Sequence, residues 1–156
     1  MKVLIAYLSY SGNTEETAQM IAERCREAKM EVEMHQIGVD PPINPEEYAL
    51  ICLGTFTWDR GSTPEEMKEF VLEIGYKPGH IAVFGSGDTQ FGGDELFCRA
   101  VDKLWTFYGS KWPMLKIEQS PRGSQERKVI EWTEGVLYDV RNTTGNSKNV
   151  GTTPSE

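Results

Sequence analysis

Ser9, Ser11 and Thr14 bring three hydroxyl groups into a short segment between an apolar run at 2–8 and an amphipathic pattern at 15–28. The apolar run predicts a buried strand, and the pattern after it predicts a helix. The first N–H groups of a helix lack intrahelical partners, and the helix dipole favours an anion there. No Lys or Arg lies between residues 9 and 14, so neutral groups would hold the anion, unlike the lysine-bearing loop of nucleoside-triphosphate sites. The segment predicts a phosphate site formed by Ser9, Tyr10, Ser11, Gly12, Asn13 and Thr14.

Two further polar segments each carry a large aromatic side chain, Trp58 in one and Phe91 in the other. Large aromatic groups are costly to expose in loops unless something stacks on them. Next to a phosphate site, two such rings would form walls for a flat ring system with a phosphorylated tail, which is the shape of flavin mononucleotide (FMN). The segments are Gly54, Thr55, Phe56, Thr57, Trp58, Asp59, Arg60 and Gly61, and Gly85, Ser86, Gly87, Asp88, Thr89, Gln90, Phe91, Gly92 and Gly93.

Strand and helix patterns alternate along the chain, which predicts a parallel sheet with helices on both faces. The expected fold is a doubly wound α/β domain with a five-stranded parallel sheet in the strand order 2-1-3-4-5. Ligands of such sheets bind at the carboxyl ends of the strands where the order reverses, here beside strands 1, 3 and 4. We expect the domain to span 1–141 and 142–156 to form a disordered tail. The predicted strands are 2–8, 31–37, 49–53, 81–84 and 114–117, and the predicted helices are 15–28, 64–74, 93–108 and 125–140.

Composition limits the classes of function. The 156 residues suit one domain, and the net charge of −8 disfavours nucleic acid and anionic membranes as partners. The three cysteines form no CxxC pair and are expected to be buried without a metal, and neither histidine, 35 or 80, is expected near the three loops. With no signal-peptide or membrane-spanning pattern, a cytoplasmic location is expected.

Taken together, the three loops resemble those of the flavodoxin family, and the resemblance extends to about residue 140. The pattern [ST]-x-[ST]-G-x-T matches Ser9 to Thr14, T-x-T-W matches Thr55 to Trp58, and G-x-G-D with a later aromatic matches Gly85 to Phe91. A phenylalanine stands where the outer stacking residue is usually tyrosine. The chain is similar to the short-chain subgroup, because its fifth strand carries no long inserted loop. The resemblance implies FMN as the cofactor, bound by Ser9, Tyr10, Ser11, Gly12, Asn13, Thr14, Thr55, Phe56, Thr57, Trp58, Asp59, Arg60, Gly61, Ser86, Gly87, Asp88, Phe91, Gly92 and Gly93.

The resemblance further implies a low-potential, monomeric one-electron carrier with non-covalent FMN and no catalytic residues of its own. It would shuttle electrons from a flavodoxin/ferredoxin reductase to acceptor enzymes, docking through an acidic rim at Asp59, Asp88, Asp94 and Glu95. Two alternatives share the fold: an FMN-dependent NAD(P)H or quinone reductase, and a specialised flavodoxin that serves ribonucleotide reductase activation. A phospho-accepting receiver domain is disfavoured, because the first and third strands lead into Ser and Thr rather than acidic residues.

Overall fold

The computed structural model describes residues 1–10, 12–57, 63–87 and 98–149, the last seven of these by their backbone alone. Its five strands form one parallel sheet in the order β2-β1-β3-β4-β5, which confirms the predicted topology. The elements are β1 (Lys2–Tyr7), α1 (Asn13–Glu27), β2 (Glu31–Gln36), the short 3-10 helix η1 (Pro45–Glu47), β3 (Leu50–Phe56), α2 (Glu65–Ile74), β4 (Ile81–Gly87), α4 (Arg99–Tyr108), β5 (Leu115–Glu118) and α5 (Ser124–Asn149).

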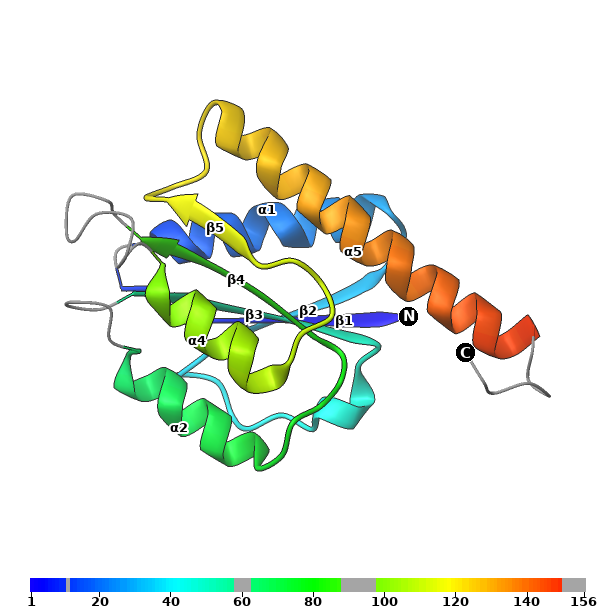
Figure 1. Cartoon of the computed structure of the whole chain (residues 1–156), viewed down its shortest axis with the longest axis horizontal. Helices are drawn as coiled ribbons and strands as arrows, with labels where there is room; N and C mark the ends of the chain where they lie inside the picture. Colours follow the sequence, from blue (N-terminus) through cyan, green and yellow to red (C-terminus); the bar gives the residue numbers. More distant parts are fainter. Residues whose placement is uncertain (11, 58–62, 88–97, 150–156) are drawn as a thin grey trace.

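Helices cover both faces of the sheet, α1 and α5 on one side and α2 and α4 on the other (Figure 1). Such coverage is what a parallel sheet requires, because each strand must cross over through a helix before it can pair in the same direction. All five strands end at the same edge of the sheet, and the segments that follow β1, β3 and β4 leave from neighbouring strands. The topology therefore brings the three candidate segments to one edge.

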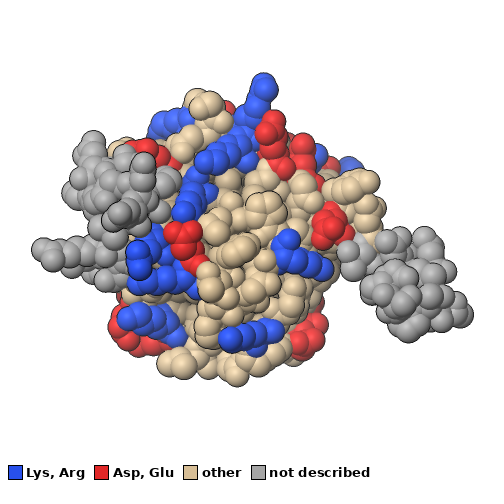
Figure 2. Space-filling model, viewed as in Figure 1, with Lys and Arg blue, Asp and Glu red and all other residues tan. Residues whose placement is uncertain are grey.

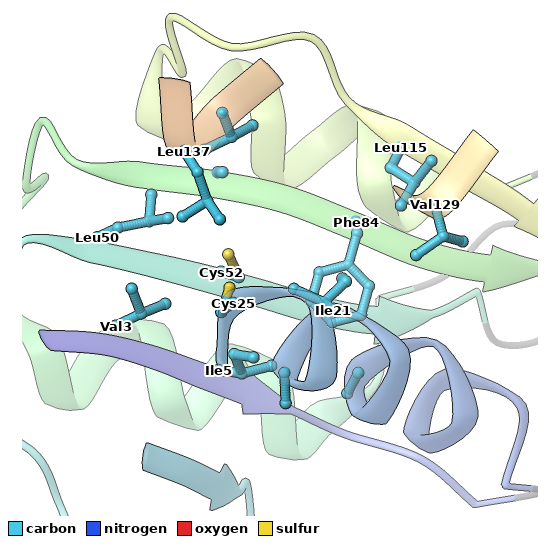
Figure 3. Close-up of a cluster of buried hydrophobic side chains, with 14 of the residues drawn as sticks. Val3, Ile5, Ile21, Cys25, Leu50, Cys52, Phe84, Leu115, Val129 and Leu137 are labelled. Atoms are coloured by element: carbon cyan, nitrogen blue, oxygen red, sulfur yellow. The ribbon is translucent and has the colours of Figure 1, made fainter. Parts of the chain in front are cut away.

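Two apolar cores lie on opposite faces of the sheet. Successive side chains of β1 alternate between them, Val3 and Ile5 facing one core and Leu4 facing the other, as the two-residue period of a strand requires. Figure 3 shows the core beneath α1 and α5, where the Phe84 ring lies close to Ile21. Because the central strands are buried on both faces, their sequences are continuously apolar.

The central strands run further than the sequence predicts. β3 continues to Phe56 and β4 to Gly87, whereas the sequence predicts that these strands end at Gly54 and Gly85. The parallel ladder continues through both glycines, with Thr55 paired to Gly85. A glycine keeps its backbone donor and acceptor, so it does not interrupt a ladder whose neighbours on both sides are already in register.

The last helix also differs from the prediction, since α5 continues to Asn149 rather than ending at Val140. The expected disordered tail at 142–156 is therefore helical in its backbone up to Asn149, and residues 150–156 lie outside the described part. Once the packed turns of a helix have formed, each added residue gains one backbone hydrogen bond without a new nucleation step. Weak helix formers can thus extend a helix that a core has already nucleated.

The three cysteines are buried, as predicted, and none of them forms a disulfide bond. Burial raises the pKa of the Cys25 thiol to about 11 and that of Cys98 to about 12, so both thiols stay protonated at neutral pH. His35 is buried in β2, and His80 hydrogen-bonds through Nε2 to the Pro45 carbonyl oxygen, 2.9 Å away. Within the described ranges, no helix has the length and apolar character needed to cross a membrane.

Candidate functional site

The edge at the carboxyl ends of β1, β3 and β4 gathers polar side chains from three distant parts of the chain. Strand pairing sets their relative positions: Tyr7 of β1 is level with Gly54 of β3, and Phe56 of β3 is level with Ser86 of β4. The Thr57 N–H donates to the Ser86 carbonyl oxygen at 3.3 Å, which carries the ladder one residue past the end of β3. The backbone of the site is thus held by the sheet itself.

The segment before α1 forms a cradle of backbone N–H groups. Gly12 precedes the helix in a left-handed conformation, with φ of 95°. The first intrahelical bond runs from the Glu16 N–H to the Gly12 carbonyl oxygen at 2.9 Å, so the N–H groups of residues 13–15 have no partner within the helix. A left-handed residue followed by right-handed helical residues turns successive N–H groups toward one concavity, which is a recurrent anion site. The predicted phosphate segment has this geometry at its described residues.

The donors of the cradle fit a phosphate group. A side chain added at Gly12 would meet no atom of the described residues within 4 Å, so among these residues the space beside this turn is open. The Ser9 hydroxyl accepts the Gly12 N–H at 3.0 Å, which closes the turn and leaves the hydroxyl hydrogen of Ser9 free to point elsewhere. Glu15 and Glu16 add negative charge to the first helical turn, and Arg122 reaches Glu16 at 3.7 Å between the guanidinium and carboxylate. The two carboxylates oppose an anion, so the attraction must come from the N–H groups after Gly12 and from the Ser9 hydroxyl, and these neutral donors fit a phosphate group.

Thr14 and Ser86 connect the cradle to β4. Their hydroxyl oxygens lie 2.7 Å apart, and both side chains are buried. Both residues are predicted from the sequence to bind the cofactor, and the structure places their hydroxyl groups in direct contact with one another.

Thr55 and Thr57 lie at the end of β3 and serve different purposes. The Thr55 side chain is buried, and its hydroxyl donates to the Phe56 carbonyl oxygen at 3.0 Å. The Thr57 hydroxyl oxygen accepts the Ala100 N–H at 3.1 Å, which satisfies a donor in the first turn of α4. Thr57 therefore links the second candidate segment to the helix that follows the third.

The rings of Tyr10 and Phe56 contact one another in a tilted arrangement, with ring centroids 4.7 Å apart at an interplanar angle of 49°. The Tyr10 hydroxyl donates to the Glu66 carboxylate of α2. This hydrogen bond lowers the pKa of Glu66 and raises that of Tyr10. Sequence reasoning missed Glu66, and no local signal could have revealed it, because the contact spans 56 residues of chain.

Two glycines of β4 are needed because neighbouring backbone atoms lie close to them, and not because their backbone angles are unusual. A Cβ on Gly85 would lie 2.3 Å from the Thr55 carbonyl oxygen, and one on Gly87 would lie 2.9 Å from the Cys98 backbone nitrogen. Gly87 was predicted to bind the cofactor, and its missing side chain lets α4 begin directly against β4. The two glycines thus keep the elements around the site close together.

Several predicted site residues lie outside the described ranges, so their placement stays a prediction. They include both stacking aromatics and four acidic residues of the predicted rim: Ser11, Trp58, Asp59, Arg60, Gly61, Asp88, Phe91, Gly92, Gly93, Asp94 and Glu95. Among the described residues, no group of three His, Cys, Asp or Glu side chains is arranged to hold a metal ion.

Comparison with known proteins shows the family of this chain. A family model described as "Flavodoxin" matches residues 5–109, which include all three candidate segments. The chain is 35% identical over 140 residues to a probable flavodoxin 2 of Bacillus subtilis (strain 168), covering 84% of this chain and 91% of that protein.

Solved structures agree with these matches. The crystal structure of oxidised flavodoxin 2 from Bacillus cereus has 34% sequence identity and a TM-score of 0.74, covering 89% of this chain and 99% of the other. That of oxidised flavodoxin 1 from the same organism has 29% identity and a TM-score of 0.77, covering 88% and 98%.

Proposed function

Because this chain belongs to the flavodoxin family, we propose that it is a low-potential one-electron carrier that takes electrons from a reductase and delivers them to acceptor enzymes. Flavodoxins bind FMN and transfer electrons rather than catalyse reactions on a substrate, so the reductase alternative is not favoured. The observation that carries the proposal is the cradle of N–H groups after Gly12, beside the ends of β3 and β4. We further propose that the protein is a cytoplasmic monomer.

The chain's own residues would divide the work of holding non-covalent FMN. The N–H groups after Gly12 and the hydroxyls of Ser9 and Thr14 would bind the phosphate, since each can donate to an oxygen anion. The redox chemistry belongs to the bound flavin, and the protein supplies its position and its electrostatic surroundings. Trp58 and Phe91 are proposed, from sequence alone, to cover the two faces of the flavin ring.

Acidic residues near the site support docking to basic partner surfaces. The described residues from 31 to 74 carry nine carboxylates and a single lysine, Lys68. Three of the carboxylates, Glu65, Glu66 and Glu69, lie in the first turns of α2, the helix that follows β3. Lys and Arg instead form a band over α5, β5 and the start of α4, on the face seen in Figure 2. The described residues from 31 to 74 are thus strongly acidic, and we propose that the side of α2 meets the reductase or the acceptor.

A coupled assay tests the carrier function. Purified protein loaded with FMN is added to NADPH, a flavodoxin/ferredoxin reductase and oxidised cytochrome c. We expect the rate of cytochrome reduction to rise with carrier concentration until it saturates, and to fall with added salt, because exposed charges are screened at ionic strengths of about 0.1 M and above. The protein should not oxidise NADPH when the reductase is omitted.

Variants of the acidic residues test the docking surface. Glu65→Gln combined with Glu69→Gln should weaken the salt dependence and raise the carrier concentration needed for half-maximal rate. Glu131→Gln is the matched control, because Glu131 is an exposed carboxylate of α5, which covers the other face of the sheet from α2. NADPH oxidation without reductase, or a rate no greater than that of free FMN, would contradict the proposed function.

A further inference from the structure

Two buried hydroxyl groups, one from Thr14 and one from Ser86, contact each other at the candidate site. The oxygens of Thr14 and Ser86 lie 2.7 Å apart, and the two side chains are only 1% and 3% exposed. Buried hydroxyls are costly without partners, so the contact satisfies both groups. A pairing across 72 residues of chain is not produced by local turn chemistry; it depends on α1 packing over the end of β4.

The two members of the pair differ in how they are positioned. Ser86 is fixed by the sheet, since it is paired to Phe56 on one side and to Ile117 on the other. Thr14 lies in the first turn of α1, among the N–H groups that form the cradle. Ser86 is therefore the rigid support, and Thr14 is the member of the pair that belongs to the turn forming the cradle.

The direction of the hydrogen bond follows from what a phosphate can accept. The pair has two hydroxyl hydrogens, and their mutual bond uses one of them. A phosphate monoester near neutral pH presents acceptor oxygens, so a hydroxyl that binds it must donate its hydrogen to it. If Thr14 donates to the phosphate, then its bond with Ser86 must be donated by Ser86.

We propose that Ser86 is a positioning residue for the phosphate group of the cofactor, acting through Thr14 rather than by touching the phosphate itself. This inference rests on the proposed function, because it takes the phosphate of FMN as the anion. The Ser86 hydroxyl donates to the Thr14 oxygen, fixes the Thr14 side chain and leaves its hydrogen directed into the cradle. Ser86 thereby contributes to the discrimination between FMN and riboflavin, which lacks the phosphate.

The test compares the dissociation constants of FMN and riboflavin for the wild-type apoprotein and for Ser86→Ala. A hydrogen bond to a neutral partner contributes about 1 kcal/mol, so we expect FMN binding to weaken about fivefold. Riboflavin binding should change less than about twofold, since no phosphate is present to use the pair. Ser110→Ala is the matched control, because Ser110 is a buried serine whose hydroxyl donates to the Ile81 carbonyl oxygen at 2.7 Å, at the opposite end of β4.

A double-mutant cycle separates positioning from direct contact. Thr14→Val should weaken FMN binding by more than Ser86→Ala does, and adding Ser86→Ala to Thr14→Val should cost little more, because Ser86 acts through Thr14. Ser86→Cys is only slightly larger and offers a weaker donor, so its FMN affinity should fall between wild type and Ser86→Ala. This variant also covers the case in which the alanine variant does not fold.

Two results would overturn the inference while leaving the proposed function intact: equal weakening of FMN and riboflavin by Ser86→Ala, or strictly additive effects in the cycle. Absence of FMN binding by the wild-type protein would overturn the proposed function, and this inference with it.

Discussion

Replacing Gly54 by alanine would place a methyl group inside the ring of Phe84. Gly54 and Phe84 are level with one another on adjacent strands, and the ring lies over the glycine. The added Cβ would lie 2.2, 2.4 and 2.7 Å from three carbons of the ring. Carbon atoms in favourable contact are about 3.5–4.0 Å apart, so the ring would have to move by more than about 1 Å.

Phe84 has little room for such a movement. It is fully buried, and its ring centroid lies 6.2 Å from that of Trp132 of α5. Overpacking of a filled core costs roughly 1–3 kcal/mol, and we expect Gly54→Ala to fall at about 2–3 kcal/mol because three atoms clash at once. Gly135→Ala is the matched control: this exposed helical glycine of α5 has no atom within 4 Å of the added methyl. It should stabilise the protein by about 0.5–1 kcal/mol.

Urea unfolding of the two variants measures these effects, and a second substitution identifies the cause. Phe84→Leu removes the clashing outer ring atoms at a cost of about 1–2 kcal/mol, less than the roughly 3–5 kcal/mol of truncation to alanine. In the Phe84→Leu background, Gly54→Ala should cost no more than about 0.5 kcal/mol. A loss below about 0.5 kcal/mol for Gly54→Ala alone, or simple additivity with Phe84→Leu, would refute the close-packing argument.

Two further perturbations probe other parts of the molecule. Burial lowers the pKa of His35 below 6.5, although the carboxylates of Asp40, Glu33 and Glu73 oppose the shift. The fold therefore favours neutral His35, and as pH falls below 6.5 the wild-type free energy of unfolding should decrease relative to His35→Gln, by at most about 1.4 kcal/mol per pH unit. A constant difference between pH 5 and 8 in urea titrations would contradict this. Gly12→Ala meets open space but must hold a φ of 95°, so it should cost about 1–2 kcal/mol in unfolding free energy and weaken FMN binding measurably; an unchanged affinity would mean that this turn does not shape the cradle.

Much of the fold follows directly from the sequence, because the spacing of apolar residues along a strand or helix indicates which of its faces are buried. The continuous apolar run of β1 and the alternation in β2 predict a central and an edge strand, and both predictions are confirmed. The ends of elements are less well specified. Gly54 and Gly85 look like loop residues in sequence, yet each faces a neighbouring group that only the folded sheet brings within reach: the Phe84 ring and the Thr55 carbonyl.

In the candidate site, too, local features are predictable from the sequence and tertiary contacts are not. The hydroxyl-rich turn before α1 is predictable because a helix N-terminus is a local feature, and its geometry depends on residues close in sequence. The pairing of Thr14 with Ser86, the bond from Tyr10 to Glu66 and the use of Thr57 by α4 depend on tertiary packing. No single-sequence pattern encodes such contacts, because each joins residues that are more than 40 positions apart.

The most direct test of the central claim is a fluorescence titration of FMN with the purified apoprotein. The account predicts strong quenching that saturates at one FMN per chain, with much weaker binding of riboflavin, because the cradle after Gly12 and the hydroxyl of Thr14 act on the phosphate alone. FMN fluorescence that remains unchanged through the titration would contradict the existence of the site.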